Sequence, residues 1–107
     1  MKEDGNKIFM NNTVNLVNIK GSTSIHIDVE ITEEGKLLFS GQDLGEVPRQ
    51  VYGDSDYEYW LTLSPVEKDQ LLLALIQDQY SGDDLVISKL RKYLESKGIN
   101  YKFNSYA

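Results

Sequence analysis

Imidazole chemistry in this chain would depend on a single residue. His26 is the sole histidine, and the 107 residues contain no cysteine, which excludes a thiolate zinc site, a disulfide and a cysteine nucleophile. A general base or an imidazole metal ligand would therefore have to be His26. Because it stands between Ile25 and Ile27, as a polar residue does on a half-buried strand, we interpret His26 as a solvated or cross-strand residue.

Three carboxylates at alternate positions resemble the start of a calcium-binding loop. They are Asp54, Asp56 and Glu58. The match stops there, because Tyr59 replaces the required glycine and Pro65 stands where the distal glutamate would be. We predict a turn followed by a strand here, and no metal site.

Two adjacent carboxylates, Asp83 and Asp84, are a candidate acid–base pair. Both also stand directly before an apolar stretch with helical spacing, where the free N–H groups of a helix start need acceptors. We therefore interpret them as helix-capping residues. The sequence predicts no catalytic residue and no cofactor.

Acidic and aromatic residues gather between Gly41 and Trp60, where Arg49 is the only cation. Aromatic anchors inside a charged rim are typical of protein-binding hot spots. The alternative is that these aromatic residues pack in the core, although alternation places Trp60 on the face opposite Tyr59. The candidate protein-binding residues are Asp43, Glu46, Tyr52, Asp54, Asp56, Glu58 and Trp60.

Alternation of apolar and polar residues predicts the sheet that positions these side chains. It is clearest over residues 24–32 and returns over residues 57–63. Gly35 provides the positive φ of a hairpin loop, so residues 24–32 and 37–40 should pair antiparallel. Residues 99–103 alternate again and predict a last short strand.

Capping signals predict a pair of helices between those strands. Residues 64–67, Ser-Pro-Val-Glu, form a capping box with proline at the first helical position, and the helix should run to about Tyr80. Asp83 or Asp84 should cap a second helix, which Gly98 should end. The first helix has one broad apolar face, and apolar residues recur at helical spacing in the second.

This element order predicts an α+β fold. We expect a two-layer sandwich, in which an antiparallel sheet of about four to five strands is covered by a helix pair inserted before the last strand. Residues 1–22 should be a frayed segment or an edge strand, and residues 23–107 a single α+β domain. The glycines and proline between residues 41 and 56 predict a connecting loop.

Charge is unevenly distributed along the chain. The net charge is −6; residues 1–64 hold five Lys/Arg against eleven Asp/Glu, whereas residues 65–107 hold six of each. An acidic sheet repels phosphate backbones, so we expect a basic protein surface as partner rather than nucleic acid. The longest apolar run is far below a bilayer span, which predicts no membrane partner and a cytoplasmic location.

Four short motifs resemble those of a group of small bacterial proteins. The group shares a Gly-Gln-Asp-Leu-Gly turn, an aromatic strand and a Gly-Ile strand near the C-terminus, and the resemblance covers roughly residues 24–106. It implies no established activity and no catalytic residues. In size and charge the chain is also similar to immunity proteins, which neutralise a cognate toxin by covering it. The motifs are residues 41–45 (GQDLG), 57–60 (YEYW), 80–83 (YSGD) and 98–103 (GINYKF).

Three functions remain open from the sequence. The first is a non-enzymatic protein-binding module in an immunity or regulatory role, which uses the acidic, aromatic surface. The second is an enzyme or small-ligand binder with a site in the 41–56 loop, where Asp43, His26 or Asp56 would be the polar residues. The third is self-association as a homodimer through an open sheet face or an edge strand.

Overall fold

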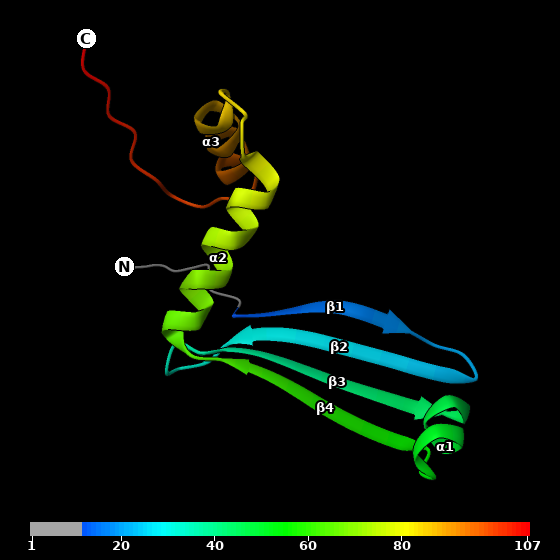
Figure 1. Ribbon diagram of the computed structural model, residues 1–107. Coiled ribbons are helices and arrows are strands. Elements are labelled where there is room, and N and C mark those ends of the chain that lie inside the picture. Colours follow the sequence, from blue (N-terminus) through cyan, green and yellow to red (C-terminus); the bar gives the residue numbers. More distant parts are fainter. Residues whose placement is uncertain (1–11) are drawn as a thin grey trace. The chain divides into compact units, whose positions relative to one another are not determined.

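The computed structural model describes residues 12–107 and has an α+β fold, as the sequence predicts. The elements divide between two compact units, 1–71 and 72–107, and each unit is described by itself. In order they are β1 (Thr13–Ile19), β2 (Thr23–Ile31), β3 (Leu37–Gly45), α1 (Glu46–Tyr52), β4 (Asp56–Leu63), α2 (Pro65–Tyr80) and α3 (Val86–Ser96) (Figure 1).

Four antiparallel strands in the order β1-β2-β3-β4 form the sheet. The predicted hairpin is confirmed: Gly35 has φ 80°, and its N–H donates to the carbonyl of Thr32 at 2.9 Å. Of the two alternatives for residues 1–22, an edge strand is present over Thr13–Ile19, and residues 1–11 lie outside the described part of the chain. A register shift between Asn15 and Val17 marks a bulge in this edge strand.

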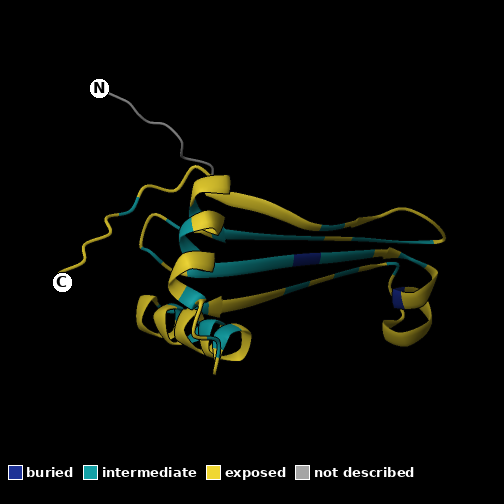
Figure 2. Cartoon of the chain, turned by 90° about the horizontal axis from the view of Figure 1, so that it is seen from above, coloured by how far each residue is buried: buried dark blue, intermediate teal, exposed yellow. Residues whose placement is uncertain are grey.

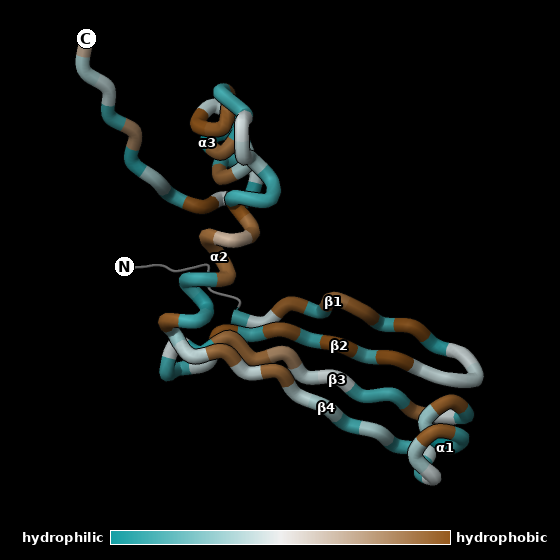
Figure 3. The backbone as a smooth tube through the Cα atoms, in the orientation of Figure 1, coloured by the Kyte–Doolittle hydropathy of each residue, from teal (hydrophilic) through white to brown (hydrophobic). Residues whose placement is uncertain are grey.

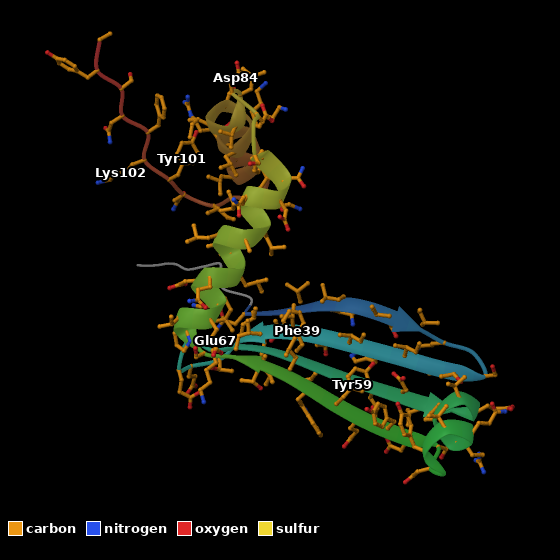
Figure 4. The ribbon with its side chains drawn as sticks, in the orientation of Figure 1. Phe39, Tyr59, Glu67, Asp84, Tyr101 and Lys102 are labelled. Atoms are coloured by element: carbon orange, nitrogen blue, oxygen red, sulfur yellow. The ribbon has the colours of Figure 1, made fainter. Side chains whose placement is uncertain are left out.

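The two faces of the sheet differ in polarity, because alternate residues point to opposite sides and paired residues share a side. The apolar face carries Ile25, Ile27, Val29, Phe39, Tyr59 and Leu61, and brown segments of Figure 3 mark the apolar residues along the strands. Phe39 and Tyr59 are labelled in Figure 4. The opposite face, called the polar face below, carries His26, Asp28, Glu30, Ser40, Gln42, Asp56, Glu58 and Trp60.

The loop predicted for residues 41–56 is wrong, because strand β3 continues to Gly45 and α1 follows it. Glycine and proline were interpreted as loop signals, but each has a different role here. Gly41 is buried within β3 (Figure 2), and a Cβ on it would lie 2.1 Å from Cε2 of the Tyr59 ring. Pro48 stands in the first turn of α1, where an N–H has no helical partner to lose.

Both predicted helices are confirmed, as are the capping box of the first and the glycine stop of the second. The amide of Ser64 donates to Glu67 Oε1 at 2.9 Å, and the amide of Glu67 donates to Ser64 Oγ at 3.2 Å, so the capping box begins α2. At the end of α3, Gly98 has φ 69° and the amide of Ile99 donates to the carbonyl of Leu94 at 2.9 Å. This is the Schellman arrangement that a glycine stop permits.

The side-chain cap predicted for α3 is wrong, because the helix begins at Val86 with Leu85 as its N-cap residue and no side chain caps it. Asp83 instead shapes the turn before the helix. The carboxylate of Asp83 accepts a hydrogen bond from the amide of Leu85 at 3.0 Å and lies 2.6 Å from Lys89 Nζ. The hydrogen bond from Lys89 has the largest effect on the pKa of Asp83, and together with the hydrogen bond from the Leu85 amide it holds that pKa below its ordinary value. None of the described helices is long and apolar enough to cross a membrane.

The strand predicted for residues 99–103 is wrong, so the sheet ends at β4 and the helix pair follows its last strand. The side chains of this segment contact α3 instead. Arg91 Cζ lies 4.0 Å from the ring centroid of Phe103, and the Tyr101 hydroxyl donates to the Glu95 carboxylate (Tyr101 is labelled in Figure 4). Alternation describes where side chains point, but a strand also needs a neighbouring backbone.

Candidate protein-binding site

Six polar-face residues from three strands form two cross-strand rows. The strand register places Gln42 opposite both His26 and Glu58, and Ser40 opposite both Asp28 and Trp60. Together with Gly41, these residues line an open hollow of about 190 Å³, which we call the Trp60 hollow. Its lining residues are His26, Asp28, Ser40, Gly41, Gln42, Glu58 and Trp60.

Side-chain size explains why a hollow forms on this face. Ser40 is the smallest side chain in its row and lies between the carboxylate of Asp28 and the indole of Trp60. Asp28 and Trp60 stand two strands apart, which separates their backbones by about 10 Å. The indole of Trp60 is not covered, and the residue is 63% exposed.

Asn15 and His26 hold the carboxylate at one side of the hollow. Asn15 Nδ2 donates to Asp28 Oδ1 at 2.9 Å, and His26 Nε2 lies 3.1 Å from Asp28 Oδ2. The hydrogen bond from Asn15 is the largest effect on the pKa of Asp28 and lowers it. Burial, the next largest, opposes it, and a weaker contribution from His26 helps to hold the pKa below its ordinary value of 3.8. Asp28 is therefore ionised at neutral pH.

The other end of the polar face is held by hydrogen bonds around Asp56. Gln42 Nε2 donates to Asp56 Oδ1 at 3.1 Å, which links β3 to β4. The amide of Asp56 in turn donates to Asp54 Oδ1 at 3.0 Å, so Asp54 shapes the turn before β4. Two of the three carboxylates considered as a calcium loop thus serve the turn and the strand pair.

The charge on the polar face has one sign. Among the described strands, none contains a lysine or an arginine. Asp28, Glu30, Asp56 and Glu58 all lie on the polar face, together with the single histidine. A face with several carboxylates and no fixed cation attracts cationic groups.

The structure divides the predicted binding residues instead of gathering them. Asp56, Glu58 and Trp60 share the polar face. Asp43 lies on the opposite face, where it accepts a hydrogen bond from the Tyr59 hydroxyl at 2.8 Å. Glu46 lies in the first turn of α1, and Asp54 in the turn that precedes β4.

Tyr52 belongs to an aromatic cluster on the apolar face. Its ring stacks on Tyr57, with centroids 4.1 Å apart, and Tyr57 lies 5.3 Å from Tyr59. Burial, followed by the hydrogen bond to Asp43, raises the pKa of Tyr59, and the hydrogen bond to Tyr57 raises that of Tyr52. Tyr57 and Tyr59 are half-buried and pack together on this face, whereas Tyr52 is 57% exposed.

This division also separates the residues considered for a small-ligand site. His26 and Asp56 lie on the polar face and Asp43 lies on the other, so the sheet itself stands between them. The 41–56 segment that would have enclosed the ligand is strand, helix and turn. The three side chains do not form one site.

Apart from Gly41, three residues of the Trp60 hollow were not among the predicted ones. Asp28 and Ser40 are ordinary polar residues with no motif around them, and the GQDLG motif that contains Gln42 implied no binding role. The hairpin contained the signal, because pairing of Ile31 with Leu37 fixes every later pair of β2 and β3. Extending that register would have placed Gln42 opposite His26.

Comparison with known protein families, curated proteins and solved structures gave no match for this chain. The resemblance to the group of small bacterial proteins stays a prediction.

Proposed function

We propose that this chain is a non-enzymatic protein-binding module that binds a basic protein through the polar face of its sheet, in an immunity or regulatory role. The observation that carries the proposal is an exposed indole, Trp60, beside carboxylates on a face whose strands contain no lysine or arginine. Tryptophan is among the residues that most often dominate binding energy in protein interfaces.

Electrostatics favour a cationic protein surface as the occupant. A sheet face that carries several carboxylates and no lysine or arginine raises the association rate with a cationic surface and repels an anionic one. The indole adds a second attraction for such a surface, because a cation that lies over the face of the ring is attracted by its quadrupole.

The size of the Trp60 hollow favours a macromolecular partner over a free small molecule. Its volume is about 190 Å³, whereas pockets that enclose small ligands measure roughly 300–1,000 Å³. A protein partner needs only a shallow anchor point within a larger contact area. The polar face provides such an area around Trp60.

The proposal is tested by capture from lysate of the source cells, followed by affinity measurements with the purified partner. We expect a basic protein whose affinity falls as salt rises. The double variant Asp56→Lys/Glu58→Lys should weaken that affinity about tenfold or more, since it replaces attraction by repulsion on the binding face.

A matched control separates this face from the overall charge. Asp69→Lys/Asp78→Lys changes the net charge by the same amount at exposed positions on α2. We expect it to leave the affinity within about twofold, because neither residue belongs to the strands that form the polar face. Equal weakening by both double variants, or recovery of only a second copy of this chain, would overturn the proposal.

A further inference from the structure

We infer that the Trp60 hollow binds the guanidinium group of one arginine side chain of the partner, stacked on the indole of Trp60 and paired with the carboxylate of Glu58. This inference rests on the proposed function and names the chemical group that the site recognises. The charge of the hollow, the exposed indole and the spacing of its side chains carry it.

The spacing suits a planar cation. Glu58 and Trp60 are two residues apart on β4, so their side chains leave the same face about 7 Å apart along the strand. A guanidinium lying on the indole can therefore direct its N–H groups along the strand toward Glu58. Ser40, opposite Trp60, leaves the space for it.

A second carboxylate, that of Asp28, lies on the side of the hollow away from Trp60. Asp28 is ionised, and its two oxygens already have partners in Asn15 and His26. It adds negative charge on the far side of the bound cation. Gln42, which donates to Asp56, separates Glu58 from the His26 side of the hollow.

An arginine fits this arrangement better than a lysine. A guanidinium is flat, stacks on an aromatic ring while it donates to a carboxylate at its edge, and is more weakly hydrated than an ammonium. An ammonium group can use the carboxylate or the ring, but has no plane to stack. The hollow should therefore distinguish the two cations.

The single tryptophan makes the test specific, because Trp60 is the only indole in the chain. The probes are three blocked tripeptides, Gly-Xaa-Gly, in which Xaa is arginine, lysine or citrulline; citrulline has the shape of arginine without its charge. Each is titrated to about 20 mM at constant ionic strength, since one cation–π contact with one charge-assisted hydrogen bond supports binding in the millimolar range.

We expect a saturable change in Trp60 fluorescence with the arginine peptide, several-fold weaker binding of the lysine peptide and none of the citrulline peptide. Glu58→Gln should weaken arginine binding about tenfold. Asp78→Asn on α2 is the matched control and should change nothing. In Trp60→Leu, which has no indole, amide chemical shifts at Ser40 and Glu58 should no longer respond to the peptide.

Several outcomes would overturn the inference. They are the absence of saturation with the arginine peptide, equal binding of arginine and citrulline, or equal binding by wild type and Glu58→Gln. If the peptide fails but Asp56→Lys/Glu58→Lys still abolishes binding of the captured partner, only the arginine anchor is lost. If the peptide binds but that double variant keeps full affinity for the partner, the proposed function fails instead.

Discussion

At the scale of single residues, Asn15 is the neighbour that most strongly sets the charge state of Asp28. Its Nδ2 donates to Asp28 Oδ1 and stabilises the ionised carboxylate. Asn15→Ala removes that donor, so we expect the pKa of Asp28 to rise toward its ordinary value. The measurement is an NMR titration of the Asp28 carboxyl carbon. Asn18→Ala, which lies opposite His26 on β1, is the control and should leave that pKa unchanged.

The same substitution has a pH-dependent effect on stability. Because the pKa of Asp28 is lower in the folded state, its ionised form stabilises the fold above the ordinary pKa of 3.8, and this contribution is lost as pH falls through the lower folded value. The difference in the free energy of unfolding between wild type and Asn15→Ala should therefore shrink in acid. A part that does not depend on pH remains, because Asn15 Nδ2 also donates to the carbonyls of Val17 and Ile27. A difference that is the same at about pH 6 and about pH 2 would contradict this.

Residue types alone predicted part of the site. Alternation along 57–63 correctly placed Trp60 and Tyr59 on opposite faces, because the period of a strand depends only on the local backbone. It did not separate Asp43 from Asp56, since that needs the register of β3 against β4. Asp28 was not proposed at all, because only the neighbouring β1 brings Asn15 to it.

At the scale of elements, the capping box of α2 is a local motif whose stability contribution can be measured. Ser64→Ala removes the oxygen that accepts from the Glu67 amide. We expect a loss of about 1 kcal/mol in the free energy of unfolding, as for other serine N-caps. Chemical denaturation measures it.

The control for that loss is a serine with no cap to remove. Ser105 is exposed in the C-terminal segment, and Ser105→Ala should change stability by less than about 0.5 kcal/mol. Equal losses in the two variants would mean that the capping hydrogen bonds contribute nothing.

The elements that sequence predicted best are those with local causes. The start of α2, the stop at Gly98 and the hairpin at Gly35 each follow from a few adjacent residues. The segment 99–103 has an equally regular pattern, yet a strand depends on a partner backbone far away in sequence. For the same reason, the glycines of β3 were mistaken for loop signals: the Tyr59 ring that covers Gly41 comes from another strand.

At the scale of the whole molecule, composition predicted the negative charge of the proposed binding face but not the location of that face. The excess of acid in residues 1–64 is found largely in the strands, which hold carboxylates and no lysine or arginine. Which carboxylates act together depends on strand pairing. Counting charges along the chain therefore supports a cationic partner, and only the register supports a site around Trp60.

The predicted single domain is tested by the cooperativity of unfolding. The unit 72–107 is shorter than about 40 residues, a length that seldom folds alone without disulfides or metals, and α2 runs across the boundary between the two units. We therefore expect one transition. Trp60 fluorescence follows the sheet, far-ultraviolet circular dichroism follows the helices, and the two denaturation curves should coincide. Ser64→Ala should move both curves together, whereas loss of the helix signal at a lower denaturant concentration would show two domains.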